Sequence, residues 1–160
     1  MNARAKAFEV DDDIETVFDF TYEKGWTDGL PVIPATPERV QRMLATVDRR
    51  PEQVVAHLAP ARLDATVEKI AVCAVMAGCR PEYFPVVLAA VEAVADPAYE
   101  LYGDNTTTNP TVPMIIINGP VRNTLDVNCS WGVLGPNKRA NATIGRALSL
   151  AMINLAGRIT

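Results

Sequence analysis

A short, strongly apolar run at residues 112–117 limits which folds are open to this chain. Met114, Ile115, Ile116 and Ile117 follow one another without a polar residue, and Asn118-Gly-Pro ends the run. An apolar run of this length, bounded by turn-forming residues, is typical of a strand that is buried on both faces. The sequence therefore predicts a buried strand that the rest of the chain has to cover.

Helix signals alternate with extended runs along the rest of the chain. Predicted helices begin at residues 11–14 and end at Gly25, begin at Thr36 and Pro37, begin near Thr66 and end at Gly78, run from Pro81 to about Asp96, and run from about Lys138 to Leu155. Shorter strands are predicted at residues 30–33, 54–58 and 121–127, and an ordered loop at residues 99–111. This alternation predicts an α/β or α+β fold, with a small, mostly buried sheet covered by about five helices.

Length and composition predict one domain spanning residues 1–160. The hydrophobic fraction is 49%, which is ample for a core, and the net charge is −4 with the basic residues scattered, so nucleic acid is not an expected partner. No apolar run approaches the roughly 18 to 20 residues that span a bilayer, and the three cysteines have no metal-binding spacing. We therefore expect a cytoplasmic protein with free thiols that does not associate with a membrane. Because the chain stops three residues after Gly157, we also expect a partner chain to complete the domain.

The residue types that are scarce narrow the function more than those that are common. His57 is the only histidine, so this chain alone cannot supply a histidine-rich zinc site or a two-histidine iron site. It has no G-x-S-x-G elbow, no Walker A loop and no G-x-G-x-x-G fingerprint. We therefore expect neither a bound metal nor a nucleotide cofactor.

The loop at residues 128–137, which leads into the last helix, is a candidate anion site. Its glycines permit close backbone approach, and the backbone N–H groups of a helix start favour negative charge. In this interpretation Lys138, Arg139 and Asn141 hold the anion, whereas Asn128 and Ser130 position polar groups. Turn formation and helix capping explain the same residues without a ligand.

Neutral polar side chains form a second candidate site. Residues 104–109 contain Thr107 among several Asn and Thr residues, and Asn118 follows the apolar run. Such a cluster suits a small polar ligand, but it equally suits a loop that satisfies its own backbone hydrogen bonds.

Three residues are candidates for catalysis. Cys79 lies between a helix end and a helix start and precedes Arg80, a setting that could lower its thiol pKa, and Cys129 lies in the candidate anion loop. Asp28 could act as an acid or base. Packing explains the cysteines equally well, and a turn explains Asp28. Cys73, in an apolar helix, is expected in the core.

Several sequence words resemble a known bacterial domain. They are Gly25-Trp-Thr-Asp-Gly-Leu-Pro-Val-Ile-Pro, Val67-Glu-Lys-Ile-Ala, Ala77-Gly-Cys-Arg-Pro-Glu-Tyr, Asn118-Gly-Pro and Arg139-Ala-Asn-Ala-Thr-Ile-Gly-Arg-Ala. The chain resembles, from about Thr16 to Leu155, a domain associated and sometimes fused with the UGSC family of thiol- or selenol-motif proteins. That family is similar to the glycine and sarcosine reductase selenoproteins. The resemblance implies carbon–heteroatom bond chemistry, by a lyase or a reductive cleavage.

The chain departs from that family in lacking a Cys-Gly-Ser-Cys stretch, so the resemblance implies that any redox cysteine lies on a partner. Two hypotheses follow. In the first, the chain is a subunit of a small-molecule enzyme that acts on a polar or anionic substrate, in a homo- or hetero-oligomer. In the second, it is a non-catalytic ligand-binding or scaffolding subunit of a heteromeric complex. Fold or family analogy alone does not decide between them.

Overall fold

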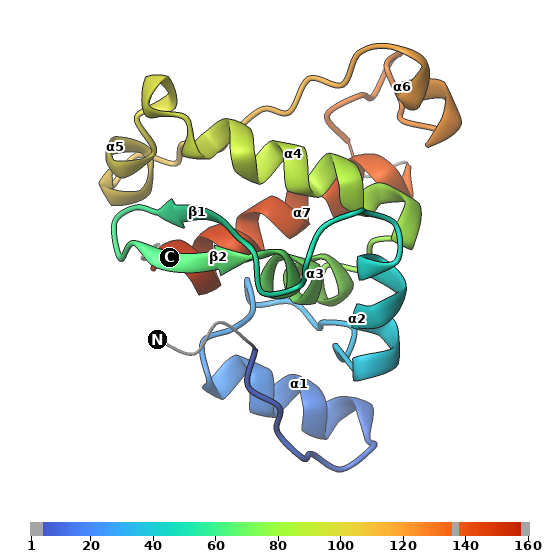
Figure 1. The fold of residues 1–160 in the computed structure, drawn as a ribbon, viewed down its shortest axis with the longest axis vertical. Helices are drawn as coiled ribbons and strands as arrows, with labels where there is room; N and C mark the ends of the chain where they lie inside the picture. The colour runs from blue at the N-terminus through green and yellow to red at the C-terminus, as the bar shows by residue number, and fades with distance from the viewer. Residues whose placement is uncertain (1–4, 136–137, 158–160) are drawn as a thin grey trace.

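The computed structural model describes residues 5–135 and 138–157 and has an α+β fold (Figure 1). The predicted fold class is therefore confirmed, with seven α-helices and one two-stranded antiparallel sheet in the described ranges. The α-helices are α1 (Ile14–Glu23), α2 (Pro37–Leu44), α3 (Val67–Met76), α4 (Phe84–Ala95), α5 (Leu101–Thr106), α6 (Pro120–Thr124) and α7 (Arg139–Ala151). The strands are β1 (Val54–Leu58) and β2 (Leu63–Thr66), and short 3-10 or π turns lie at Pro81–Tyr83, Pro97–Tyr99 and Met152–Ala156.

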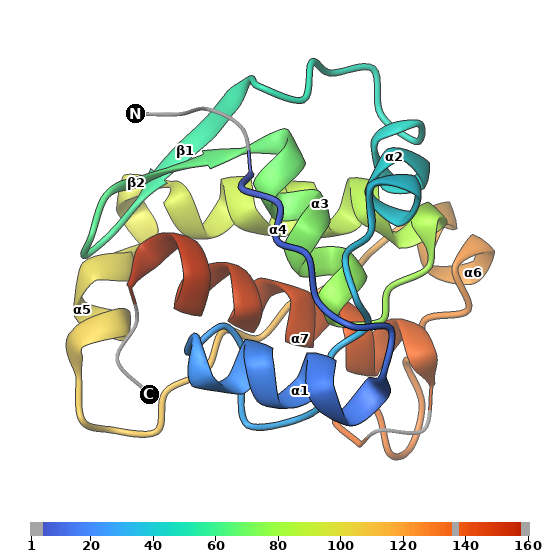
Figure 2. The same cartoon turned by 90° about the horizontal axis from the view of Figure 1, so that it is seen from below.

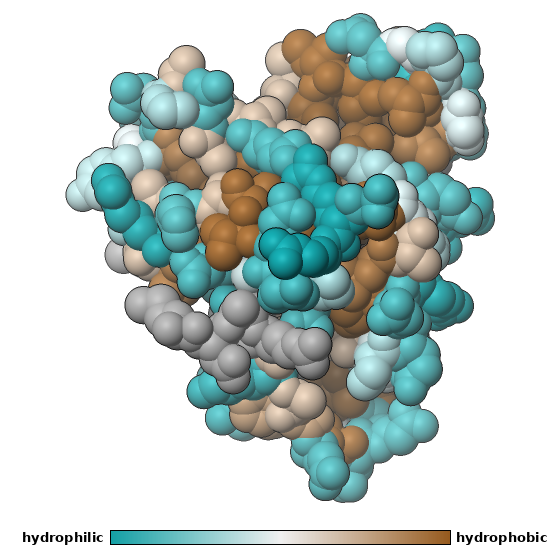
Figure 3. All heavy atoms as spheres, viewed as in Figure 1, coloured by the Kyte–Doolittle hydropathy of each residue, from teal (hydrophilic) through white to brown (hydrophobic). Residues whose placement is uncertain are grey.

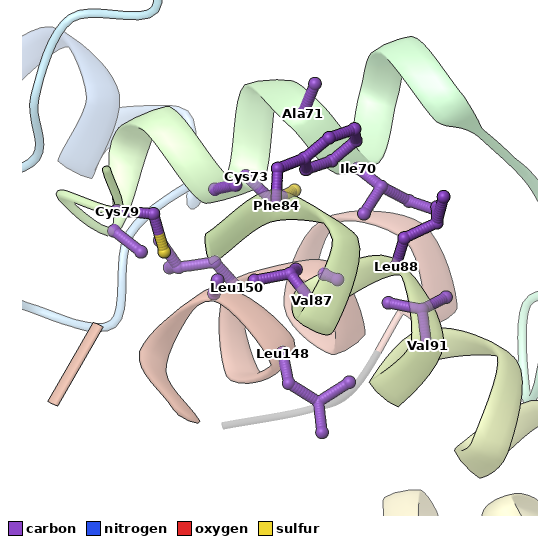
Figure 4. Packing of buried hydrophobic residues seen from close by; sticks show 14 of the residues in the cluster. Ile70, Ala71, Cys73, Cys79, Phe84, Val87, Leu88, Val91, Leu148 and Leu150 are labelled. Atoms are coloured by element: carbon purple, nitrogen blue, oxygen red, sulfur yellow. The ribbon is translucent and has the colours of Figure 1, made fainter. Parts of the chain in front are cut away.

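The core lies between helices α3, α4 and α7, each of which contacts the other two (Figures 1 and 2). Figure 4 shows their apolar side chains interleaved, with Phe84, Ile70 and Leu150 among those fully buried. α3 is buried along nearly its whole length because almost every residue in it is apolar or small. α2 covers the outer side of α3.

Local sequence signals explain where the helices begin and end. The side chains of Asp13, Thr36 and Thr66 each accept a hydrogen bond from a backbone N–H in the first turn of α1, α2 and α3. Gly78 follows α3 with φ +87°, a left-handed conformation that favours glycine at a helix end. The predicted starts of these helices are confirmed.

The sheet is a single hairpin at one end of the helical core. Its register runs from Val54 opposite Thr66 to Leu58 opposite Leu63, and it packs on α4 and on the Met152–Ala156 turn. Leu58 is fully buried, but Val54 and Leu63 remain exposed. The strand predicted at residues 54–58 is confirmed.

The strand predicted at residues 112–117 is wrong, because this segment pairs with no strand in the described part of the chain. It runs in an extended path along α4 between α5 and α6 (Figure 1). Val112, Met114 and Ile116 are exposed, whereas Ile115 and Ile117 are half-buried against the core. The expected burial on both faces is thus also wrong.

Three further predictions differ from the structure. Residues 30–33 form no strand. Their Ile33 N–H donates to the Met76 carbonyl oxygen at the end of α3 (3.1 Å) rather than to a neighbouring strand. Residues 121–127 overlap α6, because Pro120 starts a helical turn after Gly119. The loop expected at residues 99–111 contains α5.

α1 lies at the edge of the molecule, at the lower end of Figure 1. An aromatic cluster joins it to the preceding and following segments, with the Trp26 ring 5.3 Å from that of Phe8 and 5.8 Å from that of Phe20. Trp26 leads directly into the turn that forms one wall of the candidate site.

Candidate functional site

An open cleft of about 1140 Å³ lies where three distant parts of the chain meet. One wall is the turn that follows α1, including Thr27 and Asp28, and a second is residues 105–109 at and after the end of α5. Ser149 and Ile153, near the end of α7, also line it. The cleft therefore brings the Trp-Thr-Asp-Gly word and the Asn- and Thr-rich segment together.

Arg146 of α7 holds Asp28 in place at the side of this cleft. Its Nε donates to Asp28 Oδ2 (2.9 Å) and its Nη2 to Asp28 Oδ1 (2.8 Å), and the same Nη2 reaches the carbonyl oxygens of Leu30 and Pro31. Both charged side chains are only 21% exposed. These hydrogen bonds and the positive charge hold the pKa of Asp28 below its usual value, despite burial. Asp28 thus stays ionised and positions the turn, an arrangement that does not favour the predicted acid role.

Asn105 is the most unusual polar residue of the cleft. It is 3% exposed and its Nδ2 donates to the Ala59 carbonyl oxygen (2.8 Å). Its Oδ1 is buried and accepts no hydrogen bond within the described residues. An unsatisfied buried acceptor costs about 1–3 kcal/mol, so a donor brought against it is stabilised.

Hydroxyl groups and carboxylates complete the polar lining. The Thr107 hydroxyl accepts from the Asn109 backbone N–H (3.2 Å), and the Thr106 hydroxyl donates to the backbone carbonyl oxygen of Tyr102 within α5 (2.8 Å). The charged side chains that line the cleft in the described part of the chain, Glu23 and Asp28, are both acidic. The lining therefore suits a neutral polar molecule better than an anion.

The candidate anion loop folds against the start of α7, as expected, but its side chains have partners within the chain. Asn141 Oδ1 accepts from the Asn128 N–H (2.8 Å), and Asn141 Nδ2 donates to the carbonyl oxygens of Asn128 and Val133. Asn128 Oδ1 in turn accepts from the Ser130 N–H (3.0 Å). Asn141 therefore fixes the loop on the helix.

The two basic residues of that site are engaged in the same way. Lys138 Nζ lies 2.6 Å from Asp126 Oδ2, and Arg139 Nε donates to the Gly78 carbonyl oxygen (3.0 Å). Residues 136–137 of the predicted anion loop lie outside the described residues. Asn118, predicted to bind substrate, lies instead beside α4.

The environment of Cys79 in the fold differs from that of a reactive thiol. The side chain is buried, and its Sγ donates to the Thr143 carbonyl oxygen (3.3 Å). Burial raises the pKa of this thiol to about 11, more than the hydrogen bond and the nearby Arg139 lower it. The packing interpretation of Cys79 is therefore favoured over the catalytic one, because desolvation outweighs the charged neighbours along the chain.

The other two cysteines lie in opposite environments. Cys73 is fully buried, and burial raises the pKa of its thiol to about 12, so the expectation of a core residue is confirmed. Cys129 is exposed and contacts the guanidinium group of Arg122. Neither residue lines the cleft.

Arg146 and Ser149 carry no local sequence signal that marks them as residues of the site. Arg146 lies within the Arg139-Ala-Asn-Ala-Thr-Ile-Gly-Arg-Ala word, but its partner Asp28 is 118 residues away along the chain. Only the fold brings the two together. A charged residue within a helix that is otherwise largely core-facing is the one available signal, and it does not identify the partner.

Fold and cleft define a small α+β protein with a polar site between a turn, a short helix and a long helix. No family model, characterised protein or solved structure matches the chain. In residues 5–135 and 138–157, no group of three or more His, Cys, Asp or Glu side chains is placed to hold a metal ion. None of the helices described has the combined length and apolar character needed to cross a membrane.

Proposed function

We propose that this chain is a subunit of a small-molecule enzyme and binds a neutral polar substrate in the cleft around Asn105 and Thr107. The observation that carries the proposal is the unsatisfied Asn105 Oδ1, buried beside a cleft with hydroxyl and amide groups on its rim. A substrate with an amide N–H or a hydroxyl group would donate to the threonine hydroxyls and, after a local movement that exposes the buried oxygen to the cleft, to Asn105 Oδ1. An anion suits the cleft less, because the charged side chains that line it in the described part of the chain, Glu23 and Asp28, are acidic.

The reaction class in this proposal follows the resemblance to the UGSC-associated domain. It is carbon–heteroatom bond chemistry, a lyase or reductive cleavage, in an oligomer located in the cytoplasm. Asp28 and Arg146 position the turn of the cleft, and Cys79 is held in the core. The reacting groups would then come from a partner chain.

The non-catalytic alternative, a ligand-binding or scaffolding subunit, is favoured by one observation. Asp28, the predicted acid or base that lines the cleft, is already paired with Arg146, and no cysteine lines the cleft. Turnover by the purified chain without a partner would exclude this alternative. If the chain alone binds substrate without turnover, and turnover appears when a second chain is added, the enzyme-subunit proposal is supported.

The binding step is tested by NMR titration of the intact chain with two matched probe sets, small neutral amides and polyols and small carboxylates. We expect the neutral set to perturb the backbone amides of residues 105–109, and the Thr107→Val variant to weaken that binding by about threefold to tenfold. Thr124→Val, on α6, is the matched control and should bind as the native chain does.

Two results would contradict the proposal. One is the absence of any perturbation in the cleft with the neutral probes. The other is a response confined to carboxylates at the start of α7, which would instead support the anion site predicted there.

A further inference from the structure

The backbone hydrogen-bonding groups of residues 112–118 are unpaired within the described part of the chain. The segment is extended, yet its N–H and carbonyl groups make no hydrogen bond within the described ranges. Extended chain with free N–H and carbonyl groups is a template for pairing with another strand. An extended segment has two hydrogen-bonding edges. Because Pro113 has no N–H to donate, only the other edge has a full set of donors and acceptors.

The side chains of this segment alternate as those of a strand do. Val112, Met114 and Ile116 are 76%, 71% and 71% exposed, whereas Ile115 and Ile117 turn toward the core. Together with α4, the segment lines an open apolar groove of about 420 Å³. Figure 3 shows apolar side chains gathered on the face around α6 and the segment that leads into it. An exposed apolar stripe beside an apolar groove is typical of a protein-interaction surface.

The charge pattern favours a second copy of this chain as the occupant. Between Asp104 and Arg122 the sequence carries no charged residue. When a strand pairs with its own copy about a two-fold axis, charged residues close to the axis lie near their own copies. A segment without charged residues therefore pairs with itself without like-charge repulsion.

The alternation of exposed and half-buried side chains along the segment also fits self-pairing. A two-fold axis at Ile115 places Met114 opposite Ile116 of the second copy and Val112 opposite Asn118, so that the exposed stripes meet on one face. N–H and carbonyl groups of alternate residues point to the same edge, and Pro113 interrupts the edge of residues 113, 115 and 117. The intact edge is that of Val112, Met114, Ile116 and Asn118.

We infer that two copies of this chain associate through antiparallel pairing of residues 112–118, which then form the strand that the sequence predicts. The segment is short, and pairing alone falls below the about 800 Å² per partner of a standard interface. The dimer is therefore concentration-dependent. The inference does not rest on the proposed function, since of these residues only Val112 also lines the polar cleft.

Sedimentation velocity across about 1 µM to 1 mM tests the inference, because weak complexes dissociate within that range. We expect the native chain to shift from monomer to dimer. We expect Ile116→Lys, which places two like charges beside the two-fold axis, to stay monomeric throughout, and Met114→Lys to do the same. Ile14→Lys, at a 79% exposed position of α1, is the matched control and should dimerise as the native chain does.

Amide hydrogen exchange followed by NMR then separates strand pairing from side-chain packing. In the dimer, the amides of Met114, Ile116 and Asn118 should exchange more slowly than in Ile116→Lys, while those of Ile115 and Ile117 change less. A native chain that is monomeric at all concentrations would overturn the inference, as would a dimer that survives Ile116→Lys and Met114→Lys. A dimer in which these amides exchange freely would overturn strand pairing as its basis. Protection that appears only when a different protein is added would overturn a second copy of this chain as the occupant.

Discussion

Arg146 and Asp28 form two parallel hydrogen bonds of 2.9 and 2.8 Å that join the turn after α1 to the middle of α7. The same guanidinium group reaches the carbonyl oxygens of Leu30 and Pro31, so one side chain fixes the course of four successive residues. This contact fixes the turn that forms one wall of the cleft. The same pairing does not favour the predicted acid role of Asp28.

The first prediction concerns Arg146→Ala. We expect it to lower the free energy of unfolding by about 2 kcal/mol, because two charge-assisted hydrogen bonds are lost and Asp28 remains partly buried without its partner. Urea denaturation measures the change. The control is Arg49→Ala, which breaks the more exposed Arg49–Glu92 pair and should cost less than about 1 kcal/mol. Equal losses in the two variants would contradict the role assigned to Arg146.

The second prediction concerns the acid side of the stability profile. The pKa of Asp28 in the folded chain lies below its ordinary value of 3.8, so its stabilisation is present above that value and is lost as the pH falls through the folded pKa. The stability difference between the native chain and Asp28→Asn should therefore be full at pH 7 and should shrink below about pH 3.8. Urea midpoints at pH 7 and in acid measure it. A difference independent of pH would show that the carboxylate charge does not contribute.

The third prediction concerns thiol reactivity. A shift of the Cys79 pKa from 9.0 to about 11 lowers its thiolate fraction about a hundredfold at neutral pH, and burial further limits access. In the native chain, iodoacetamide should modify Cys129 first, with Cys73 and Cys79 protected. Mass spectrometry of the alkylated peptides measures the order, and the urea-unfolded chain is the control, in which all three should react. Native Cys79 reacting as fast as Cys129 would contradict the core assignment.

The fourth prediction compares two glycines. Gly78 has φ +87°, so Gly78→Ala should destabilise the fold by about 1–2 kcal/mol through backbone strain, although its new Cβ would meet no atom closer than 3.7 Å. Gly145 lies within α7, where a Cβ would meet nothing within 4 Å, so Gly145→Ala should stabilise by up to about 1 kcal/mol. Thermal unfolding of both variants tests the opposite signs. A loss of stability in Gly145→Ala would contradict the open environment of that helix face.

Helix boundaries could be predicted because their causes are local. Thr36 with Pro37 starts α2, Thr66 starts α3 and Gly78 follows its end, and each depends on groups within a few residues along the chain. Candidate residues for the cleft were found only in part. Asp28 and Thr107 carry the polar signal in their own segments, whereas nothing in the sequence indicates that they lie at one cleft.

The sequence by itself determined the α+β class, the helix caps and the apolar character of residues 112–117, since propensity, capping and hydrophobic patterning act over a few residues. The tertiary structure decided three things: that Arg146 meets Asp28, that Cys79 is desolvated, and that residues 112–117 are extended without a partner strand in the described chain. The physical reason is that an ion pair, burial and strand pairing each need a second segment, and the local pattern does not specify where that segment lies.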